Sequence, residues 1–384
     1  MVNLSSASIV ELVRIVRQGE RMAIYYVLIG LPMLVSAFSY ALRKRFPQTE
    51  SSKQTAGISI FFVILIAMLC LRDMACGIDL KNYYSFWHAV VNANSFQKAL
   101  DAFGIEKGYA FLEYVVALFT DEFQIFLSVV ALLCLVPVWL FYRKHAEISM
   151  LAVLLFVTVA PFSMYFSGLR QSLAMAFAIP AYLLARKKKL IWFILVCAVA
   201  TTLHNSAFVL VFLYPLCNVK LTLKWLYAVV PIMGAILVFS KQIMSFLLPI
   251  FGGDYAESYE IGENTGAYST LILLIIFAVY CFVIPDEEKI DDDTRALRNI
   301  LLLAVCIQMF APVHGLVMRV NYYFLPFVPV LIPRIVRRAK ESMRQLVLIS
   351  MIVMYSFFTV YFFYHAYTGA DILRIYPYLP FWKG

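Results

Sequence analysis

An apolar run from Ile148 to Ala185 is the feature that most constrains the fold. It has 38 residues, whereas one membrane helix needs about 20. Gly168 and Arg170 lie near its middle, so we interpret the run as two helices that meet there, with a positive charge at the membrane edge. An arginine near a helix centre costs about 2.5–3.5 kcal/mol in lipid, which favours a water-filled cavity or a partner. The alternative is a cation that extends to the membrane surface.

The same arrangement occurs twice more. Leu190 to Leu216 is interrupted by His204-Asn205-Ser206, and Ile300 to Pro333 is interrupted by His314 and Arg319. Polar groups within apolar runs are expected to face protein or water rather than lipid. The pattern predicts three hairpins that direct polar groups to the same side of a membrane.

Composition agrees with this interpretation. The chain has 384 residues, of which 63% are hydrophobic and 14% charged, and its mean hydropathy is +0.82. These values predict an all-α, polytopic integral membrane protein with about twelve transmembrane helices, external loops and short re-entrant or interfacial helices, in a single membrane domain over residues 1–384. The expected spans are residues 22–42, 56–71, 123–142, 148–167, 170–185, 190–204, 206–218, 225–240, 267–284, 297–313, 320–335 and 345–364. The net charge of +9 follows from basic loops, so we expect no nucleic acid partner.

Basic clusters fix the expected orientation. The clusters at residues 43–45, 143–144, 186–189 and 334–344 are placed in the cytoplasm, which puts 20 of the 32 Lys and Arg inside with 9 of the 23 Asp and Glu. Both termini are then outside, and residues 1–21 form an interfacial helix. The stretch 108–119 is too short for a span, since its apolar part reaches about 18 Å, and is interpreted as an external or re-entrant helix.

Three loops carry most of the remaining polar residues. The external loops are residues 72–122 and 241–267, and both mix acidic with aromatic side chains, as carbohydrate sites do. The alternative is a solvated loop with an interfacial aromatic belt. The third loop, residues 285–298, is cytoplasmic and contains Asp291-Asp292-Asp293. We interpret that run as solvated charge rather than as a metal site, because it lies opposite the other candidates.

Nucleotide-binding and zinc-protease motifs are absent from the sequence. A site on the outer face has no nucleotide sugar available, so its donor must carry a leaving group. A lipid pyrophosphate meets this requirement, and Arg72, Arg170 and Arg319 are the expected clamp because a guanidinium binds phosphate oxygens with two donors. The candidates for a general base are Asp79, His204 and Glu106, although a lone histidine between short helices is often structural. We expect no tightly bound metal ion and no cofactor.

Four motifs in order support a family assignment. They are Arg72-x4-Gly77-Ile78-Asp79-x3-Tyr83, Glu106-Lys107-Gly108-Tyr109, Ser167-Gly168-Leu169-Arg170-Gln171-x2-Ala174 and Leu203-His204-Asn205-Ser206-Ala207, with a looser continuation at Arg319-Val320-Asn321-Tyr322-Tyr323. Together they resemble the EpsG/Wzy-type family of bacterial exopolysaccharide and O-antigen polymerases. The sequence departs from the family at Ile78, where threonine is common, and at Asn205, where lysine is frequent.

The resemblance implies an inner-membrane glycosyltransferase that joins undecaprenyl-pyrophosphate-linked repeat units, as donor and acceptor, on the periplasmic or outer face. Its partners would be membrane lipids and a chain-length regulator protein. The expected catalytic residues are His204, Asp79 and Arg170. The expected substrate-binding residues are Arg72, Arg319, Gln171, Tyr83, Tyr84, Glu106, Asn205, Tyr322 and Tyr323.

Other functions remain open from the sequence. An O-antigen ligase, or a glycosyltransferase that uses a polyprenyl-phosphate sugar, would share the outward site and its arginines. A lipid-linked oligosaccharide flippase is the alternative from another class, although the chain shows no repeated halves such as alternating access favours. A scaffolding subunit would leave the membrane arginines unexplained.

Overall fold

Every regular element in the described part of the chain is helical. The computed structural model describes residues 22–38, 41, 55–93, 95–101, 106–221, 223–251, 266–369 and 373–383. Within these ranges there is no β-strand, and two isolated bridges are present. The all-α fold class predicted from the sequence is confirmed. The interfacial helix expected over residues 1–21 and the basic cluster at residues 43–45 lie outside the described residues.

The helices have the following bounds. A first helix covers Met22–Phe38. The α-helices that follow are α2 (Ala56–Leu71), α3 (Leu80–Val91), α4 (Phe96–Asp101), α5 (Lys107–Ala117), α6 (Phe123–His145), α7 (Ser149–Thr158), α8 (Met164–Ser167), α9 (Leu169–Ala176), α10 (Ala178–Arg186), α11 (Leu190–Leu203), α12 (Leu213–Asn218), α13 (Leu226–Phe251), α14 (Gly266–Val283), α15 (Asp292–Gln308), α16 (Gly315–Asn321), α17 (Val328–Arg337) and α18 (Arg344–Thr368). The 3-10 helices are η2 (Asn205–Phe212), η3 (Leu223–Trp225), η5 (Glu287–Lys289), η6 (Leu325–Phe327), η7 (Glu341–Met343) and η8 (Phe381–Lys383).

Three of these helices are long and apolar enough to cross a membrane. They are α6, the part of α13 over Tyr227–Phe246, and Glu341–Thr368, which joins η7 to α18. Gly315–Asn321 and Leu325–Arg337 form a fourth candidate if this pair, bent by 44°, is one span. Shorter apolar helices of 10–17 residues include α2, α7 and α11. The sequence-based count of about twelve spans stays a prediction.

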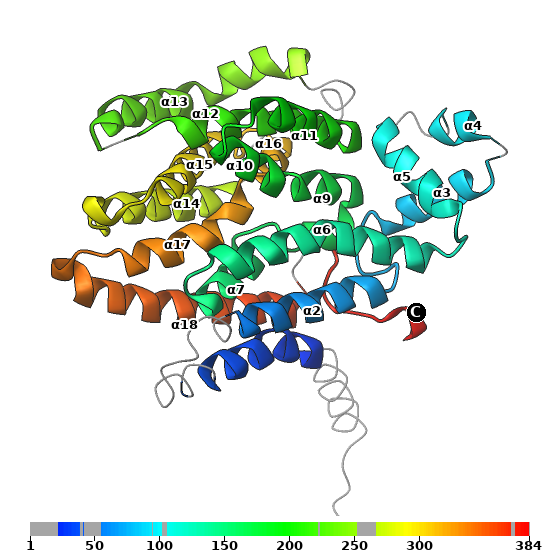
Figure 1. Cartoon of the computed structure of the whole chain (residues 1–384), viewed down its shortest axis with the longest axis horizontal. Coiled ribbons are helices and arrows are strands. Elements are labelled where there is room, and N and C mark those ends of the chain that lie inside the picture. Colours follow the sequence, from blue (N-terminus) through cyan, green and yellow to red (C-terminus); the bar gives the residue numbers. More distant parts are fainter. Residues whose placement is uncertain are drawn as a thin grey trace, which may run out of the picture.

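Aromatic side chains pack where α2, α6 and α7 meet. Phe61 and Phe62 of α2 lie 5.8 and 5.4 Å, centroid to centroid, from Phe156 of α7. Tyr142 of α6 completes the cluster, 5.5 Å from Phe156, and its hydroxyl donates to the carbonyl of Pro326 at 2.6 Å. All four rings are buried, and edge-on packing of this kind stabilises the contact beyond the area that it buries. Figure 1 shows these helices running side by side through the molecule.

Prolines divide the apolar run over residues 148–185. The helix expected over residues 148–167 ends at Thr158, ahead of Pro161, and a turn leads into the short α8. The next expected helix divides between α9 and α10, because Pro180 has no N–H to donate to the carbonyl of Ala176. The predicted breaks at Gly168, between α8 and α9, and at His204, between α11 and η2, are both present.

Two expected boundaries differ from the structure. The external loop expected from residue 241 is helical as far as Phe251, because α13 continues the apolar pattern, and residues 252–265 lie outside the described residues. The inner loop expected over residues 285–298 contains η5 and the start of α15. That helix begins at Asp292 because the side chain of Asp291 caps it by accepting from the backbone N–H of Thr294 at 2.7 Å.

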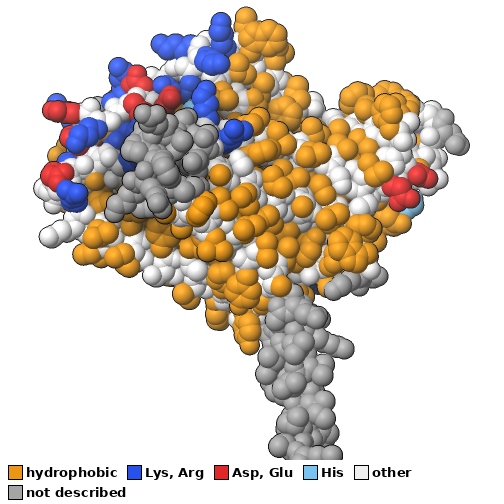
Figure 2. Space-filling view, turned by 60° about the horizontal axis from the view of Figure 1, so that its bottom comes forward, with side chains coloured by type: hydrophobic (Ala, Val, Ile, Leu, Met, Phe, Trp, Pro, Cys, Tyr) orange, Lys and Arg blue, Asp and Glu red, His pale blue; other side chains and the backbone are white. Residues whose placement is uncertain are grey.

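Charged side chains gather at one end of the molecule. Figure 2 shows Lys, Arg, Asp and Glu side chains at this end, while hydrophobic side chains cover much of the remaining visible face. Ion pairs here join loops far apart in sequence: Arg338 donates to Glu147 at 2.8 Å and to Asp291 at 2.6 Å, and Arg186 donates to Asp293 at 2.7 Å. Asp292 pairs with Arg295. The three aspartates of the acidic run are therefore all paired with arginine.

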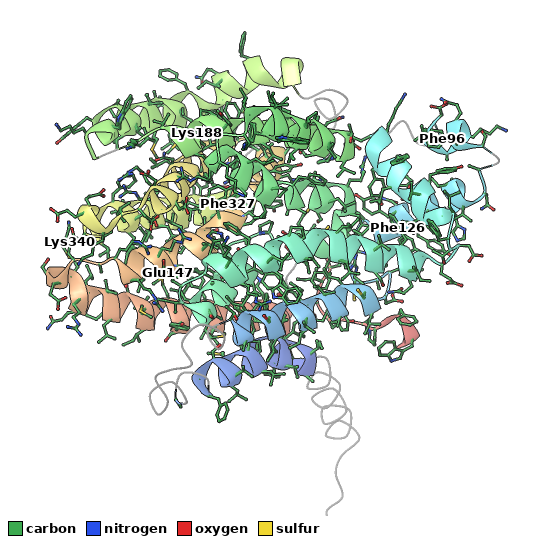
Figure 3. All side chains as sticks on the ribbon, viewed as in Figure 1. Phe96, Phe126, Glu147, Lys188, Phe327 and Lys340 are labelled. Carbon is green, nitrogen blue, oxygen red and sulfur yellow. The ribbon has the colours of Figure 1, made fainter. Side chains whose placement is uncertain are left out.

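The loops expected inside share that end. Glu147, Lys188 and Lys340 lie in the left half of Figure 3, and Phe96 and Phe126 lie on the opposite side. The far end contains α3, α4 and α5, which Figure 1 places together at the right. The external or re-entrant helix expected over residues 108–119 is α5, which is not among the candidate spans.

Candidate functional site

The Glu106 carboxylate lies at the centre of a group of polar side chains at the far end of the molecule. Its Oε2 accepts from Arg170 Nη1 at 2.7 Å, and its Oε1 lies 2.8 Å from His204 Nδ1. The same Oε1 accepts from the backbone N–H of Asn205 at 3.1 Å. The exposed fractions of the three side chains, 6% for Glu106, 17% for Arg170 and 19% for His204, show a buried carboxylate between two partners that reach the surface.

Close helix contact brings Glu106 to His204. Glu106 directly precedes α5, and the first turn of α5 lies against the last turn of α11. A Cβ on Gly108 would lie 2.7 Å from the carbonyl oxygen of Thr202, so this approach requires glycine. Because α11 ends at Leu203 and His204 is extended, the imidazole turns out of the helix toward the carboxylate.

The charge state of Glu106 follows from its surroundings. Burial by itself would raise the pKa of this carboxyl, but hydrogen bonding to His204 and the positive charge of Arg170 outweigh that effect and lower the pKa to about 2. Glu106 is therefore ionised at neutral pH and can only accept hydrogen bonds. His204 must then donate from Nδ1, so that Nε2 of the neutral imidazole is left as an acceptor.

Arg170 connects this group to α3. Its Nε donates to the hydroxyl of Tyr83 at 3.5 Å, and its guanidinium carbon lies 6.0 Å from the centroid of the Tyr83 ring. Arg170 lies in the first turn of α9, directly after the break at Gly168. Burial raises the pKa of Tyr83, against the opposing charge of Arg170, so the phenol stays neutral.

Asp79, the residue that precedes α3, lies next to this group. Its Oδ2 accepts from Ser167 Oγ at 2.9 Å, and Ser167 Oγ accepts from the Asp79 backbone N–H at 3.3 Å. The approach depends on Gly77, which has a φ of 140° and whose Cβ, if present, would collide with the carbonyl oxygen of Phe166. Asp79 therefore contacts Ser167, the residue before Gly168, and Arg170 is the second residue after Gly168.

The third interrupted run also reaches this region. Gln171, one residue after Arg170, donates to the backbone carbonyl of Arg319 at 2.6 Å. The hydroxyls of Ser206 and Tyr323 are 3.0 Å apart. The side chain of Arg319 is exposed. The three predicted breaks thus meet in one region, as the sequence pattern indicated.

Arg72 has a different environment from Arg170. It is 1% exposed, donates to the carbonyl of Leu69 at 2.7 Å, and lies 5.9 Å from the ring of Phe166. A contact between Arg72 and a lipid phosphate, as predicted from the sequence, would require this part of the molecule to open. Tyr84 packs against His88 and Phe123.

The remaining predicted residues are at the edge of the site. Asn205 is exposed and contributes its backbone N–H to Glu106. Tyr322 is half-buried and directly follows α16.

Sequence reasoning gave no role to several residues that the structure places here. Ser167 and Ser206 occur in the quoted motifs, and their hydroxyl contacts with Asp79 and Tyr323 depend on folding. Glu113 of α5 is completely buried, and its oxygens have no hydrogen-bond partner among the described residues. Glu113 lies seven residues after Glu106, which is about two turns of helix. This spacing was the only sequence feature that could have indicated that both acids lie on the same face of α5.

A comparison with protein families identifies the family of the chain. The model of the EpsG family matches residues 56–379, which include Asp79, Glu106, Arg170, His204 and Arg319. The chain belongs to the EpsG family. No curated protein and no solved structure matches the chain. Family membership and the apolar helices identify a membrane protein of polysaccharide biosynthesis, from a family of glycosyltransferase-like polymerases.

Proposed function

We propose that this EpsG-family chain is a polysaccharide polymerase that joins undecaprenyl-pyrophosphate-linked oligosaccharide repeat units on the outer face of the bacterial cytoplasmic membrane. The observation that carries the proposal is the contact of one ionised carboxylate, Glu106, with both an arginine and a histidine. The arrangement places Arg170, a cation that can bind a phosphate, beside His204, a base that can accept the proton of a hydroxyl.

The reaction is a single glycosyl transfer. A hydroxyl at the non-reducing end of the acceptor unit forms a glycosidic bond with the anomeric carbon of the donor, and the bond from that carbon to the pyrophosphate oxygen breaks. The hydroxyl proton goes to His204 Nε2, and the undecaprenyl pyrophosphate leaves as an anion. Glu106 orients the imidazole and stabilises its charged form after proton transfer, as a carboxylate does for a catalytic histidine in other enzymes.

Arg170 stabilises the negative charge that develops on the leaving pyrophosphate. Its planar guanidinium presents several donors, and Glu106 occupies Nη1 while Tyr83 is near Nε. Arg319, exposed at the same end, is available for the second phosphate. Asp79 is a second carboxylate at the site, where it can accept from a sugar hydroxyl or serve as an alternative base.

The outward orientation is supported by the distribution of charge. The ion-paired basic loops lie at one end, and the site lies at the other, beside α3 and α5 (Figures 1 and 3). Under the positive-inside rule the basic end is cytoplasmic, so the site faces outward, where lipid-linked sugars and no nucleotide sugars are available. We expect about twelve spans and an outer location for both termini.

The test uses purified protein in lipid nanodiscs with one substrate, the undecaprenyl-pyrophosphate-linked repeat unit of its host, in EDTA and without nucleotide sugar. Products are separated on a gel. A ladder with steps of one repeat unit is the expected result. If a polymerase of known activity forms a ladder in this assay and the protein does not, the proposal fails. Products longer by one sugar, formed from a polyprenyl-phosphate sugar, would instead identify the alternative glycosyltransferase.

A further inference from the structure

The last residues of the chain return to the loop that carries Asp79. The backbone N–H of Asp73 donates to the carbonyl of Leu379 at 2.8 Å, and that of Ile78 donates to the carbonyl of Leu373 at 3.0 Å. These two bonds lie at either end of the loop over residues 73–78. We call residues 373–383 the C-terminal segment.

The C-terminal segment is also attached to the helix that precedes this loop. The Tyr378 hydroxyl donates to the carbonyl of Met68 in α2 at 3.1 Å, and Pro380 forms an isolated bridge with Arg72. The Tyr25 hydroxyl, from the first helix, donates to the carbonyl of Ile375 at 2.9 Å. These contacts are spread along the segment and fix it to residues that lie about 300 or more positions earlier in the chain.

The loop contacts the site on its other side. Gly77 approaches the carbonyl of Phe166, and Asp79 exchanges two hydrogen bonds with Ser167. The loop thus lies between the C-terminal segment and the α8–α9 break that carries Arg170. The loop is not helical between Arg72 and Asp79. Two hydrogen bonds within it, from the backbone N–H groups of Ala75 and Cys76 to Asp73, act together with its contacts to the C-terminal segment and to Ser167.

We propose that the C-terminal segment is a positioning element of the transfer site, which fixes the Asp79 carboxylate relative to Arg170 through its backbone bonds to the loop over residues 73–78. The proposal rests on the proposed function at that site. The segment does not touch substrate in this account, and it acts through Asp79. Displacement of a reacting group by about 1 Å can cost about 10²-fold in rate, so loss of the segment should lower transfer strongly.

The test compares two truncations of the full chain in nanodiscs. A chain that ends at residue 372 lacks the C-terminal segment, and a chain that ends at Pro380 lacks only residues 381–384, of which Phe381 and Trp382 are exposed. The first readout is hydrogen exchange of the backbone N–H groups of Asp73 and Ile78. We expect fast exchange in the shorter chain, with α6 unchanged, and wild-type exchange in the longer one.

The second readout is the rate of transfer, measured with and without Asp79→Asn. We expect truncation at residue 372 to slow transfer by about tenfold or more, and Asp79→Asn to slow the full chain but to add little to the truncated one. If truncation instead caused a structural defect elsewhere, the fold-loss in rate of the truncated Asp79→Asn chain would be the product of the two separate fold-losses. A multiplied loss, or wild-type transfer by the shorter chain, would overturn the proposal.

Two further results separate the possible failures. If the shorter chain does not insert, Tyr378→Ala replaces it, because this variant loses the hydroxyl that donates to Met68. Asp79→Asn is then combined with Tyr378→Ala in the same way. If the full-length wild-type protein makes no ladder, the proposed function fails, and hydrogen exchange still reports whether the segment fixes the loop. Unchanged exchange at Asp73 and Ile78 in the variants contradicts the positioning role whatever the activity.

Discussion

At the scale of single residues, Glu106 determines the chemistry of the site. One carboxylate oxygen accepts a hydrogen bond from Arg170, and the other accepts hydrogen bonds from His204 and from the backbone N–H of Asn205. Hydrogen bonds to an ionised partner are about twice as strong as those between neutral groups. The arrangement gives Arg170 a fixed position and His204 a fixed tautomer, which are the two requirements of the transfer step.

Arg170 should be essential because the leaving pyrophosphate carries charge in the transition state. We expect Arg170→Ala to slow polymer formation by about 10²–10³-fold, with the protein still inserted. Arg170→Lys should restore little, because an ammonium cannot bind the Glu106 carboxylate and a phosphate in the same planar geometry. The measurement is the rate of ladder formation in nanodiscs.

Lys107→Ala is the matched control for these variants, because Lys107 is an exposed cation next to Glu106. It should retain near-normal activity. Near-normal polymer from either Arg170 variant would exclude this arginine from the mechanism.

At the scale of elements, α5 contains a buried acid that makes its packing sensitive to pH. Burial raises the pKa of Glu113 to about 8, against smaller opposing effects of Tyr109 and Arg170. The folded state therefore favours the neutral carboxyl. The resulting contribution to stability is complete below the ordinary pKa of 4.5 and is lost as the pH rises through about 8.

Thermal unfolding between pH 6 and pH 9 tests this expectation. The wild-type protein should lose stability as the pH rises from 6 toward 8, by about 1.4 kcal/mol per pH unit at most, and this loss should level off above pH 8, whereas Glu113→Gln should show little of this dependence. An identical pH dependence in wild type and Glu113→Gln would show that Glu113 is ionised when folded.

The sequence predicted the helix breaks better than the contacts between them. Gly168 and His204 interrupt apolar runs, and polar groups in such runs must leave lipid, so both breaks could be predicted. Glu106 is 64 residues from Arg170 and 98 from His204, and no periodicity relates positions so far apart. Their contact depends on the close approach of Gly108 to Thr202, which only the packed structure shows.

At the scale of the whole molecule, the site and the basic loops lie at opposite ends. The aspartates at residues 291–293 pair with arginines at the basic end, among them Arg186 and Arg338. The pairs with Arg186 and Arg338 were not predicted, because these arginines are distant in the sequence. The role of the C-terminal segment was missed for a similar reason, since its contacts are mostly made by backbone groups, which leave no sequence motif.

Cysteine labelling in intact cells tests the orientation. A cysteine introduced at the exposed Asn82 of α3 should react with a membrane-impermeant thiol reagent once any outer membrane is permeabilised. A cysteine at the exposed Lys188 should react only after lysis. The unsubstituted protein controls for the seven native cysteines. The reverse pattern would place the site in the cytoplasm and remove the argument for a lipid-linked donor.

The most direct test of the central claim is a double-mutant cycle on the first transfer, with Glu106→Gln, His204→Gln and the pair. Each rate is measured in nanodiscs from the appearance of the first dimer of repeat units. Because Glu106 acts on the hydroxyl proton through His204, we expect each single variant to be slow, by about 10²-fold or more, and the double variant to be no slower than Glu106→Gln alone. Losses that multiply, or a wild-type rate in His204→Gln, would contradict this account of the site.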